Sequence, residues 1–280
     1  MASYEDRLRR VFDHIYDHPD GDLSLDALAD VAAMSRFHWH RVFHAMTGET
    51  CAQAVRRLRA HRAACWLVQT DWTIDQIASR AGYDNPQSFA RLFRSQFGMT
   101  PMAFRQAGQA GPPDVVFVEG QPNMFDVEIK EKPDLRLAAM THIGPYPEIG
   151  RAFEQVSAIF TSQNLWAQAR GMVGVYCDDP ASKPESELSS EAGVVIEDGF
   201  AMPNDLHEKR LMGGRHAVLV FKGPYSGLRA AYDHMFGQWL PQSGEEPADA
   251  PCYEIYLNNP REVAPAELLT EICVPLEPRA

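Results

Sequence analysis

The first hundred residues of this 280-residue chain carry the same pattern of two short helices twice, over 24–50 and over 73–100. Matching positions lie 49 residues apart in the first helix of each copy and 50 apart in the second: Leu25/Ile74, Leu28/Ile77, Ala29/Ala78, Ala32/Ala81, Phe43/Phe93, Gly48/Gly98 and Thr50/Thr100. A one-residue insertion falls where the second helix starts, which is a place where the backbone absorbs it. The pattern therefore predicts a duplicated, all-helical module.

The first helix of each copy begins with a capping signal. Ser24 and Thr73 stand where a hydroxyl accepts hydrogen bonds from free helix amides, and Gln76 completes a capping box with Thr73. The apolar residues that follow keep the spacing of a single buried helix face. Small alanines close each helix and permit a near approach of the next one.

The second helix of each copy divides into an inward and an outward face. It is expected to begin at Ser35 in one copy and at Asp84 or Asn85 in the other, and to end at Gly48 or Gly98. The predicted inward residues are Phe37 or Trp39 with Val42, Phe43 and Met46, and then Phe89, Leu92, Phe93 and Phe97. The outward residues are Arg36, His40, Arg41 and His44, and then Gln87, Ser88, Arg91 and Arg94. Such side chains reach base edges and phosphates, and their occurrence in two copies favours DNA binding over a merely solvated face.

Residues 4–106 resemble the tandem helix-turn-helix DNA-binding domain of AraC/XylS-type transcription regulators. The resemblance rests on SRFHWHRVFHAMTG, RRLRAHRAACWLVQT and IDQIASRAGYDNPQSFARLFRSQFGMTPMAFR. It implies that bases are read by Phe37, His40 and Arg41 in one half and by Pro86, Gln87, Ser88 and Arg91 in the other. Because Pro86 has no side-chain hydrogen-bond donor, we expect the first half to dominate base recognition.

A single helix is expected to connect the two copies over 50–69. At 1.5 Å per residue it is about 27 to 30 Å long, close to the roughly 34 Å that separates successive major grooves on one face of DNA. One chain could thus cover two half-sites of double-stranded DNA. The helix also carries Arg56, Arg57, Arg59 and Arg62, some of which we expect to pair with carboxylates inside the domain.

Charge divides the chain into two parts. Residues 1–110 hold 13 Arg, no Lys and 12 acidic residues, whereas the remainder holds 13 basic and 26 acidic residues, a net charge of −13. An acidic second half repels the phosphate backbone and needs another task. Gly108, Gly111, Pro112 and Pro113 mark the boundary. We predict a multidomain protein with an all-α tandem helix-turn-helix domain over 1–110 and an α+β domain over 115–280.

The second half is itself duplicated. Gly144-Pro145-Tyr146 recurs as Gly223-Pro224-Tyr225 at an offset of 79, and VGVYCDDP echoes YEIYLNNP at an offset of 80. Each repeat reads as a strand, a GPY turn, a helix and further strands, so two pseudo-symmetric repeats are expected. These turns, CYEIYLNNP and LLTEICVPL resemble the GyrI-like effector-binding domain, over about 115–278. The resemblance implies a ligand cleft between the repeats, with a strand glutamate that anchors cationic, apolar compounds.

That glutamate corresponds to Glu254. Strand alternation places Glu254 on one face with Tyr256, and the repeat partner of Glu254 is Gly174, so the pseudo-symmetry supplies only one acid. Tyr176 and Tyr256 are expected to flank the axis. An exposed glutamate at a sheet edge is the alternative.

Four further aromatic residues are candidates for lining the ligand site: Tyr146 and Tyr225 from the GPY turns, and Trp166 and Trp239, which follow the two helices. The tyrosines could instead cap their turns by hydrogen bonding. The tryptophans could instead pack in the core, as aromatic residues after an amphipathic helix often do.

Together these features predict a ligand-responsive transcription regulator that binds DNA and a small cationic or amphipathic molecule, and that is not primarily an enzyme. A second hypothesis is a GyrI-like hydrolase of small reactive electrophiles, with Glu254 activating water. A third is a regulator whose acidic half holds RNA polymerase or a DNA-binding enzyme.

The remaining sequence features concern the cellular location of the protein, its cysteines and its capacity to bind a metal or cofactor. No run of 18 apolar residues or apolar signal core is found, so we expect a cytoplasmic protein without membrane contact. Five isolated cysteines suit free thiols in a reducing compartment. No cofactor is implied, and His40 with His44 lacks the further ligands that a metal site needs.

Overall fold

The computed structural model describes residues 2–107, 125–180, 182–260 and 262–279. The predicted domain boundary at Gly108 to Pro113 lies outside the described residues. The described residues of Met1–Arg36 and Thr47–Val118 form one compact unit, and those of Phe37–Met46 and Glu119–Ala280 form the other. The second unit thus includes ten residues that the sequence assigns to the helix-turn-helix domain.

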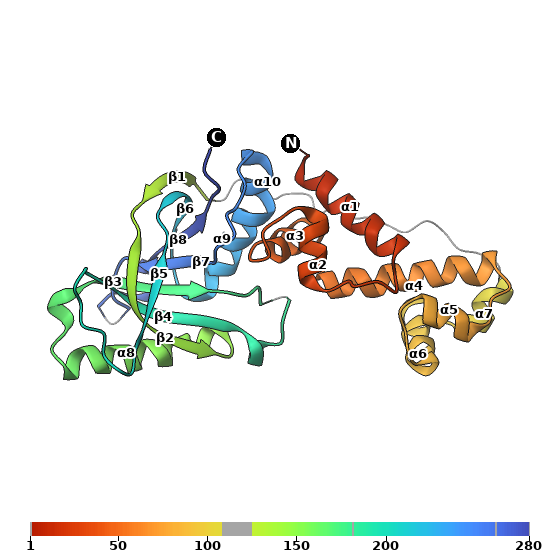
Figure 1. The fold of residues 1–280 in the computed structure, drawn as a ribbon, viewed down its shortest axis with the longest axis horizontal. Helices are drawn as coiled ribbons and strands as arrows, with labels where there is room; N and C mark the ends of the chain where they lie inside the picture. Colours follow the sequence, from red (N-terminus) through yellow and green to blue (C-terminus); the bar gives the residue numbers. More distant parts are fainter. Residues whose placement is uncertain (1, 108–124, 181, 261, 280) are drawn as a thin grey trace. The chain divides into compact units, whose positions relative to one another are not determined.

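The first unit is helical, as predicted. Its helices are α1 (Tyr4–Asp17), α2 (Leu25–Ala32), α4 (Cys51–Gln69), α5 (Ile74–Arg80), α6 (Pro86–Phe97) and α7 (Pro101–Ala107) (Figure 1). The predicted caps are confirmed: the Ser24 hydroxyl accepts from the amide of Ala27, and Thr73 forms its capping box with Gln76. The connecting helix α4 is capped by Thr50. The Arg57 guanidinium forms an ion pair with Glu49 of the same unit, as predicted for some of the arginines on this helix.

The helix α3 (Trp39–Thr47) belongs to the second unit except for its last residue, Thr47. It begins four residues later than predicted, because residues 36–38 form a turn. The His38 ring in that turn is fully buried and stacks on Phe236, 5.5 Å away between ring centroids. Helix starts are poorly fixed by local sequence, and here a tertiary contact decides the start. The predicted inward residues Trp39, Val42, Phe43 and Met46 are buried.

The second unit is built on one eight-stranded antiparallel sheet (Figure 1). Its strands are β1 (Val127–Lys132), β2 (Leu135–Ile143), β3 (Ala169–Tyr176), β4 (Ser189–Ile196), β5 (His207–Leu211), β6 (Gly214–Lys222), β7 (Cys252–Tyr256) and β8 (Leu269–Pro275). The order β1-β6-β8-β7-β3-β4-β2-β5 reads as two matching halves that meet at the β7–β3 pair. The predicted pseudo-symmetric repeats are therefore confirmed, and each repeat lends its first strand to the edge of the other.

Helices cover one face of this sheet. They are α8 (Gly150–Ser162) in the first repeat, and α9 (Leu228–His234), the π-helix Met235–Trp239 and α10 (Leu240–Ser243) in the second. Short 3-10 turns are η1 (Tyr146–Ile149), η2 (Trp166–Gln168), η3 (Glu185–Glu187), η4 (Tyr225–Gly227) and η6 (Pro265–Glu267). Phe160 of α8 packs on Ala138 and Val194, whereas Tyr253 and Val173 belong to a separate core on the opposite sheet face.

The two separate cores show which face of the sheet carries the predicted acid, Glu254. Tyr253 faces the core without α8, so strand alternation turns Glu254 and Tyr256 toward the helices. No helix of the described residues is long and apolar enough to cross a membrane.

Candidate functional site

The central β3–β7 pair brings the predicted acid and its repeat partner face to face. Glu254 is paired directly with Gly174 across the two strands. The hydroxyl groups of Tyr176 and Tyr256 meet at 2.8 Å. A Cβ atom at Gly174 would lie 2.8 Å from the Tyr256 oxygen and 3.1 Å from the Tyr176 oxygen. The glycine is therefore what allows the two tyrosines to close over the pseudo-symmetry axis.

Glu254 is buried with only 3% of its surface exposed, so the interpretation as an exposed edge glutamate is wrong. Its two carboxylate oxygens accept hydrogen bonds from Tyr232 and Tyr256, each at 3.0 Å. We call Glu254, Tyr176, Tyr232 and Tyr256 the acid–tyrosine cluster.

Burial is the largest influence on this carboxyl group. It raises the pKa of Glu254 to about 7, although the hydroxyls of Tyr232, Tyr256 and Tyr176 and the charge of Arg41 act in the opposite direction. Near neutral pH the carboxyl therefore exchanges readily between its neutral and charged forms. A cation placed beside it would favour the charged form.

Further aromatic rings surround the cluster edge-on. Tyr256 meets Phe153 of α8 at 5.4 Å and Tyr225 of η4 at 5.6 Å between ring centroids. Tyr146 meets Tyr176 at 4.8 Å. Rings from both repeats and a buried acid thus converge on the sheet face that carries the helices. This combination suits a cation with an apolar body.

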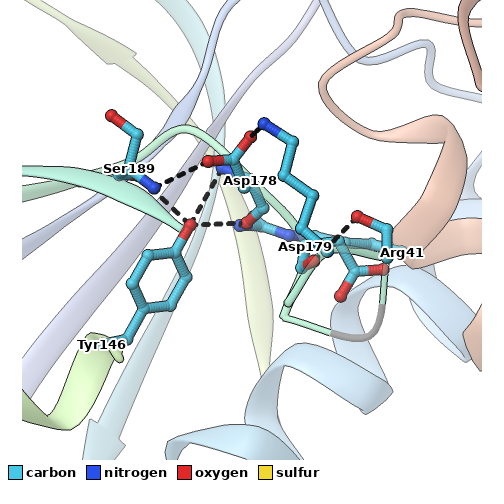
Figure 2. Close-up of polar contacts among 7 residues, drawn as sticks. Arg41, Tyr146, Asp178, Asp179 and Ser189 are labelled. Carbon is cyan, nitrogen blue, oxygen red and sulfur yellow. Dashed lines mark hydrogen bonds and ion pairs between the residues drawn. The ribbon is translucent and has the colours of Figure 1, made fainter. Parts of the chain in front are cut away.

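The two GPY tyrosines behave differently. The Tyr146 hydroxyl donates to the carbonyl oxygen of Asp178 at 2.8 Å and accepts from the Asp178 amide at 2.9 Å, and it also lies 3.3 Å from the Ser189 carbonyl (Figure 2). It ties the end of β3 to the start of β4, so the proposed hydrogen-bonding role applies to this residue. Tyr225 is 40% exposed and only its ring meets the cluster.

The two tryptophans lie apart from these contacts. Trp166 is 42% exposed, donates its indole N–H to Thr161 and packs on Phe160. Trp239 is half-buried in the π-helix, and none of its described contacts joins it to the cluster. Their role in ligand binding stays a prediction.

The predicted outward face of the second recognition helix, α6, is largely exposed to solvent. Pro86, Gln87, Arg91 and Arg94 are exposed and Ser88 is half-buried. Arg91 donates to the Ser88 hydroxyl at 3.4 Å, a long hydrogen bond that leaves the guanidinium in solvent. Their contact with DNA stays a prediction.

The first recognition helix, α3, differs sharply. Arg36 is exposed and Phe37 is half-buried, but His40 and Arg41 are buried, with 7% and 9% of their surfaces exposed. The Arg41 guanidinium donates to the carbonyl oxygen of Asp178 at 2.8 Å and to the Cys252 sulfur. Its carbon lies 5.2 Å from the Tyr232 ring centroid and 5.6 Å from that of Phe236.

Sequence reasoning missed Tyr232 and the second set of partners for Arg41. Tyr232 could have been found, because the offset of 79 makes it the repeat mate of Phe153, and both residues contact the cluster. No sequence signal predicts the position of Arg41, because its hydrogen-bond partners lie 137 or more positions away along the chain.

The fold and the site together define a DNA-binding transcription regulator with a small-molecule-binding domain. Residues 28–107 match a helix-turn-helix domain model, and residues 125–277 match the model of the GyrI-like small molecule binding domain. The chain belongs to the AraC-type regulators that carry a GyrI-like domain. It is 35% identical over 236 residues to the transcriptional regulator Rob of Salmonella typhimurium, covering 80% of this chain and 81% of Rob.

Each half also has relatives of its own. The regulatory protein SoxS of Salmonella typhimurium is 31% identical over 37% of this chain and 96% of SoxS. A DNA gyrase inhibitor of Yersinia enterocolitica is 28% identical over 48% of this chain and 87% of the inhibitor. Both halves of the chain therefore match nearly whole proteins, which agrees with a regulator assembled from two modules.

Proposed function

We propose that this regulator binds double-stranded DNA in the cytoplasm through its helix-turn-helix residues, and responds to a small cationic or amphipathic molecule at the acid–tyrosine cluster. The observation that carries the ligand class is Glu254, a buried carboxylate held by tyrosine hydroxyls and surrounded by aromatic rings. A buried carboxylate is unfavourable unless it is paired, so this position favours a cationic partner.

The rings add to that preference. A cation over an aromatic face gains about 0.5 to 2 kcal/mol, more when it is desolvated. The Arg41 guanidinium already lies against the rings of Tyr232 and Phe236, which supports the suitability of these rings for a cation.

The ligand class can be tested with a matched pair of probes. Benzyltrimethylammonium and its neutral carbon analogue neopentylbenzene have the same shape and differ in charge. Calorimetry on the full chain should detect the cation and not the analogue, and Glu254→Gln should weaken the cation about tenfold or more. Glu187→Gln, at an exposed glutamate of the same unit, is the control. Equal binding of the cation by the Glu254→Gln variant and the wild type would refute the proposal.

The DNA contacts are tested separately. On α6 the outward residues Gln87, Arg91 and Arg94 are exposed, which supports their predicted contact with DNA. Mapping of bound DNA across a genome, with and without benzyltrimethylammonium, would identify the operator and the direction of the response. Binding without sequence preference would contradict a site-specific regulator.

One observation favours a second function, hydrolysis of small reactive electrophiles. A carboxyl group with a pKa of about 7 suits a general base near neutral pH, and Glu254 is bonded to two tyrosine hydroxyls that could polarise a substrate. Conversion of p-nitrostyrene oxide to its diol, lost in Glu254→Gln, would support it. Stoichiometric binding of the cationic probe without turnover of the epoxide favours the sensor.

A direct contact with RNA polymerase also stays a prediction, supported by the net charge of −13 in residues 111–280. Such a complex should dissociate at moderate salt, because exposed charges are screened within about 8 to 10 Å at physiological ionic strength. Pull-down of purified polymerase across a salt series would test it, and retention at high salt would argue against charge as the basis.

A further inference from the structure

The Arg41 guanidinium is surrounded by the kinds of groups that bind a cationic ligand. It donates to one carbonyl oxygen and one sulfur atom, and its central carbon lies over two aromatic rings. One of these rings, Tyr232, donates its hydroxyl to Glu254. The guanidinium and the buried acid are therefore joined through a single side chain, and the charge of each influences the other.

Two further contacts join α3 and the turn before it to the segment that follows Tyr232. His38 stacks on Phe236 with an interplanar angle of 22°. Gly237 faces Ala45, and a Cβ atom at Gly237 would lie only 2.9 Å from the Ala45 Cβ. Phe236 and Gly237 both belong to the π-helix Met235–Trp239, whereas α8 in the other repeat is an unbroken α-helix. π-Helical turns are rare and often mark functional sites.

We propose that the position of the Arg41 guanidinium is the effector site, that its ligands are planar guanidinium or amidinium cations, and that such an effector competes with α3 for it. This inference rests on the proposed function and extends it. A planar cation with N–H groups can repeat the bond to the Asp178 carbonyl, which a quaternary ammonium cannot do.

Competition has a direct consequence for DNA binding. While Arg41 and His40 are buried within the second unit, their side chains cannot reach base edges, although the outward α6 residues Gln87, Arg91 and Arg94 are exposed. When an effector takes the place of the Arg41 guanidinium, the side chains of Arg41 and His40 become exposed and can contact base edges. Because the coupling is reciprocal, whatever loosens α3 must strengthen effector binding and DNA binding together.

Gly237 offers a way to loosen α3 without changing a residue that contacts DNA or ligand. In Gly237→Leu the new side chain collides with Ala45 and should weaken the docking of α3 about tenfold or more. Gly150→Leu is the matched control, since a Cβ atom at the exposed Gly150 meets nothing within 4 Å. Benzamidine serves as the amidinium probe.

The experiment measures two affinities in the full-length chain, for benzamidine and for DNA selected by the wild-type protein. Gly237→Leu should bind both more tightly than the wild type, by similar factors, and Gly150→Leu should match the wild type. If Gly237→Leu leaves both affinities unchanged, α3 does not compete and the inference is overturned. If no cation binds to any variant while Gly237→Leu binds DNA more tightly, the docking of α3 stands and the proposed ligand class fails.

A cysteine pair tests the opposite perturbation and does not depend on the folding of Gly237→Leu. In the double variant Ala45→Cys, Gly237→Cys the two Cβ atoms start 2.9 Å apart, so α3 must shift outward by about 1 Å to reach the separation of about 3.8 Å that disulfides adopt. Oxidation should lock α3 in place and abolish both sequence-specific DNA binding and benzamidine binding, and reductant should restore them. The single variant Ala45→Cys is the control. Full DNA binding by the oxidised, crosslinked protein would overturn the inference.

Discussion

Replacing Glu254 by glutamine should change how the stability of the second unit depends on pH. The pKa of Glu254 is raised from 4.5 to about 7 by burial. A carboxyl group with a raised pKa binds its proton more tightly in the folded protein, so its contribution to stability is present at low pH and lost as the pH rises through 7. With these two values the free energy of unfolding should fall by about 2 to 3 kcal/mol between pH 5 and pH 8.

The Glu254→Gln variant lacks this titration, so the informative quantity is the wild-type free energy of unfolding minus that of the variant. Taking the difference at each pH cancels the titration of other groups, including His38. Urea unfolding followed by pulsed hydrogen exchange and mass spectrometry resolves peptides of β7 and β8 from those of the helical first unit. The difference should decrease by about 2 to 3 kcal/mol from pH 5 to pH 8. A difference that stays constant over this range would refute burial as the dominant influence on Glu254.

Three further predictions concern the remaining parts of the site. With saturating benzamidine present to release Arg41, Arg41→Ala should reduce the preference for operator over scrambled DNA by about 1 to 3 kcal/mol, and an unchanged ratio of the two affinities would show that Arg41 reads no base. Gly174→Ala should force Tyr256 aside and weaken binding of benzyltrimethylammonium in calorimetry, whereas unchanged binding would remove the tyrosine pair from the site. Burial lowers the pKa of His38 to about 3, so α3 should loosen about fivefold as the pH falls from 6.5 to 5.5. Hydrogen exchange of residues 37–46, corrected for the intrinsic rate, should show this loosening in the wild type and lose it in His38→Phe.

Much of the fold could be predicted because it follows from local signals and repetition. The caps at Ser24 and Thr73 and the turn at Gly98 are set by hydroxyls and a glycine that act within a few residues. The offset of 80 places Gly174 opposite Glu254 because two repeats related by pseudo-symmetry must meet at their equivalent strands. The start of α3 could not be predicted, since it depends on the packing of His38 against Phe236.

The candidate site was predicted in part for the same reason. Strand alternation is a local rule, and it placed Glu254 and Tyr256 on one face correctly. The rule says nothing about which helix residue arrives above that face, so the hydroxyl of Tyr232 was not expected. Periodicity also could not distinguish a helix face that awaits DNA from one that packs on another part of the same chain.

The amino-acid sequence by itself determined the two duplications, their helix ends and the single acid at the pseudo-symmetry axis, because these depend on short-range geometry and on the spacing of repeats. The tertiary structure alone decided that Glu254 is buried beneath three tyrosines and that Arg41 lies against Tyr232 and Phe236. Burial and cation–ring contacts arise only when segments that are distant in the sequence meet, and local patterns of residues do not specify those meetings.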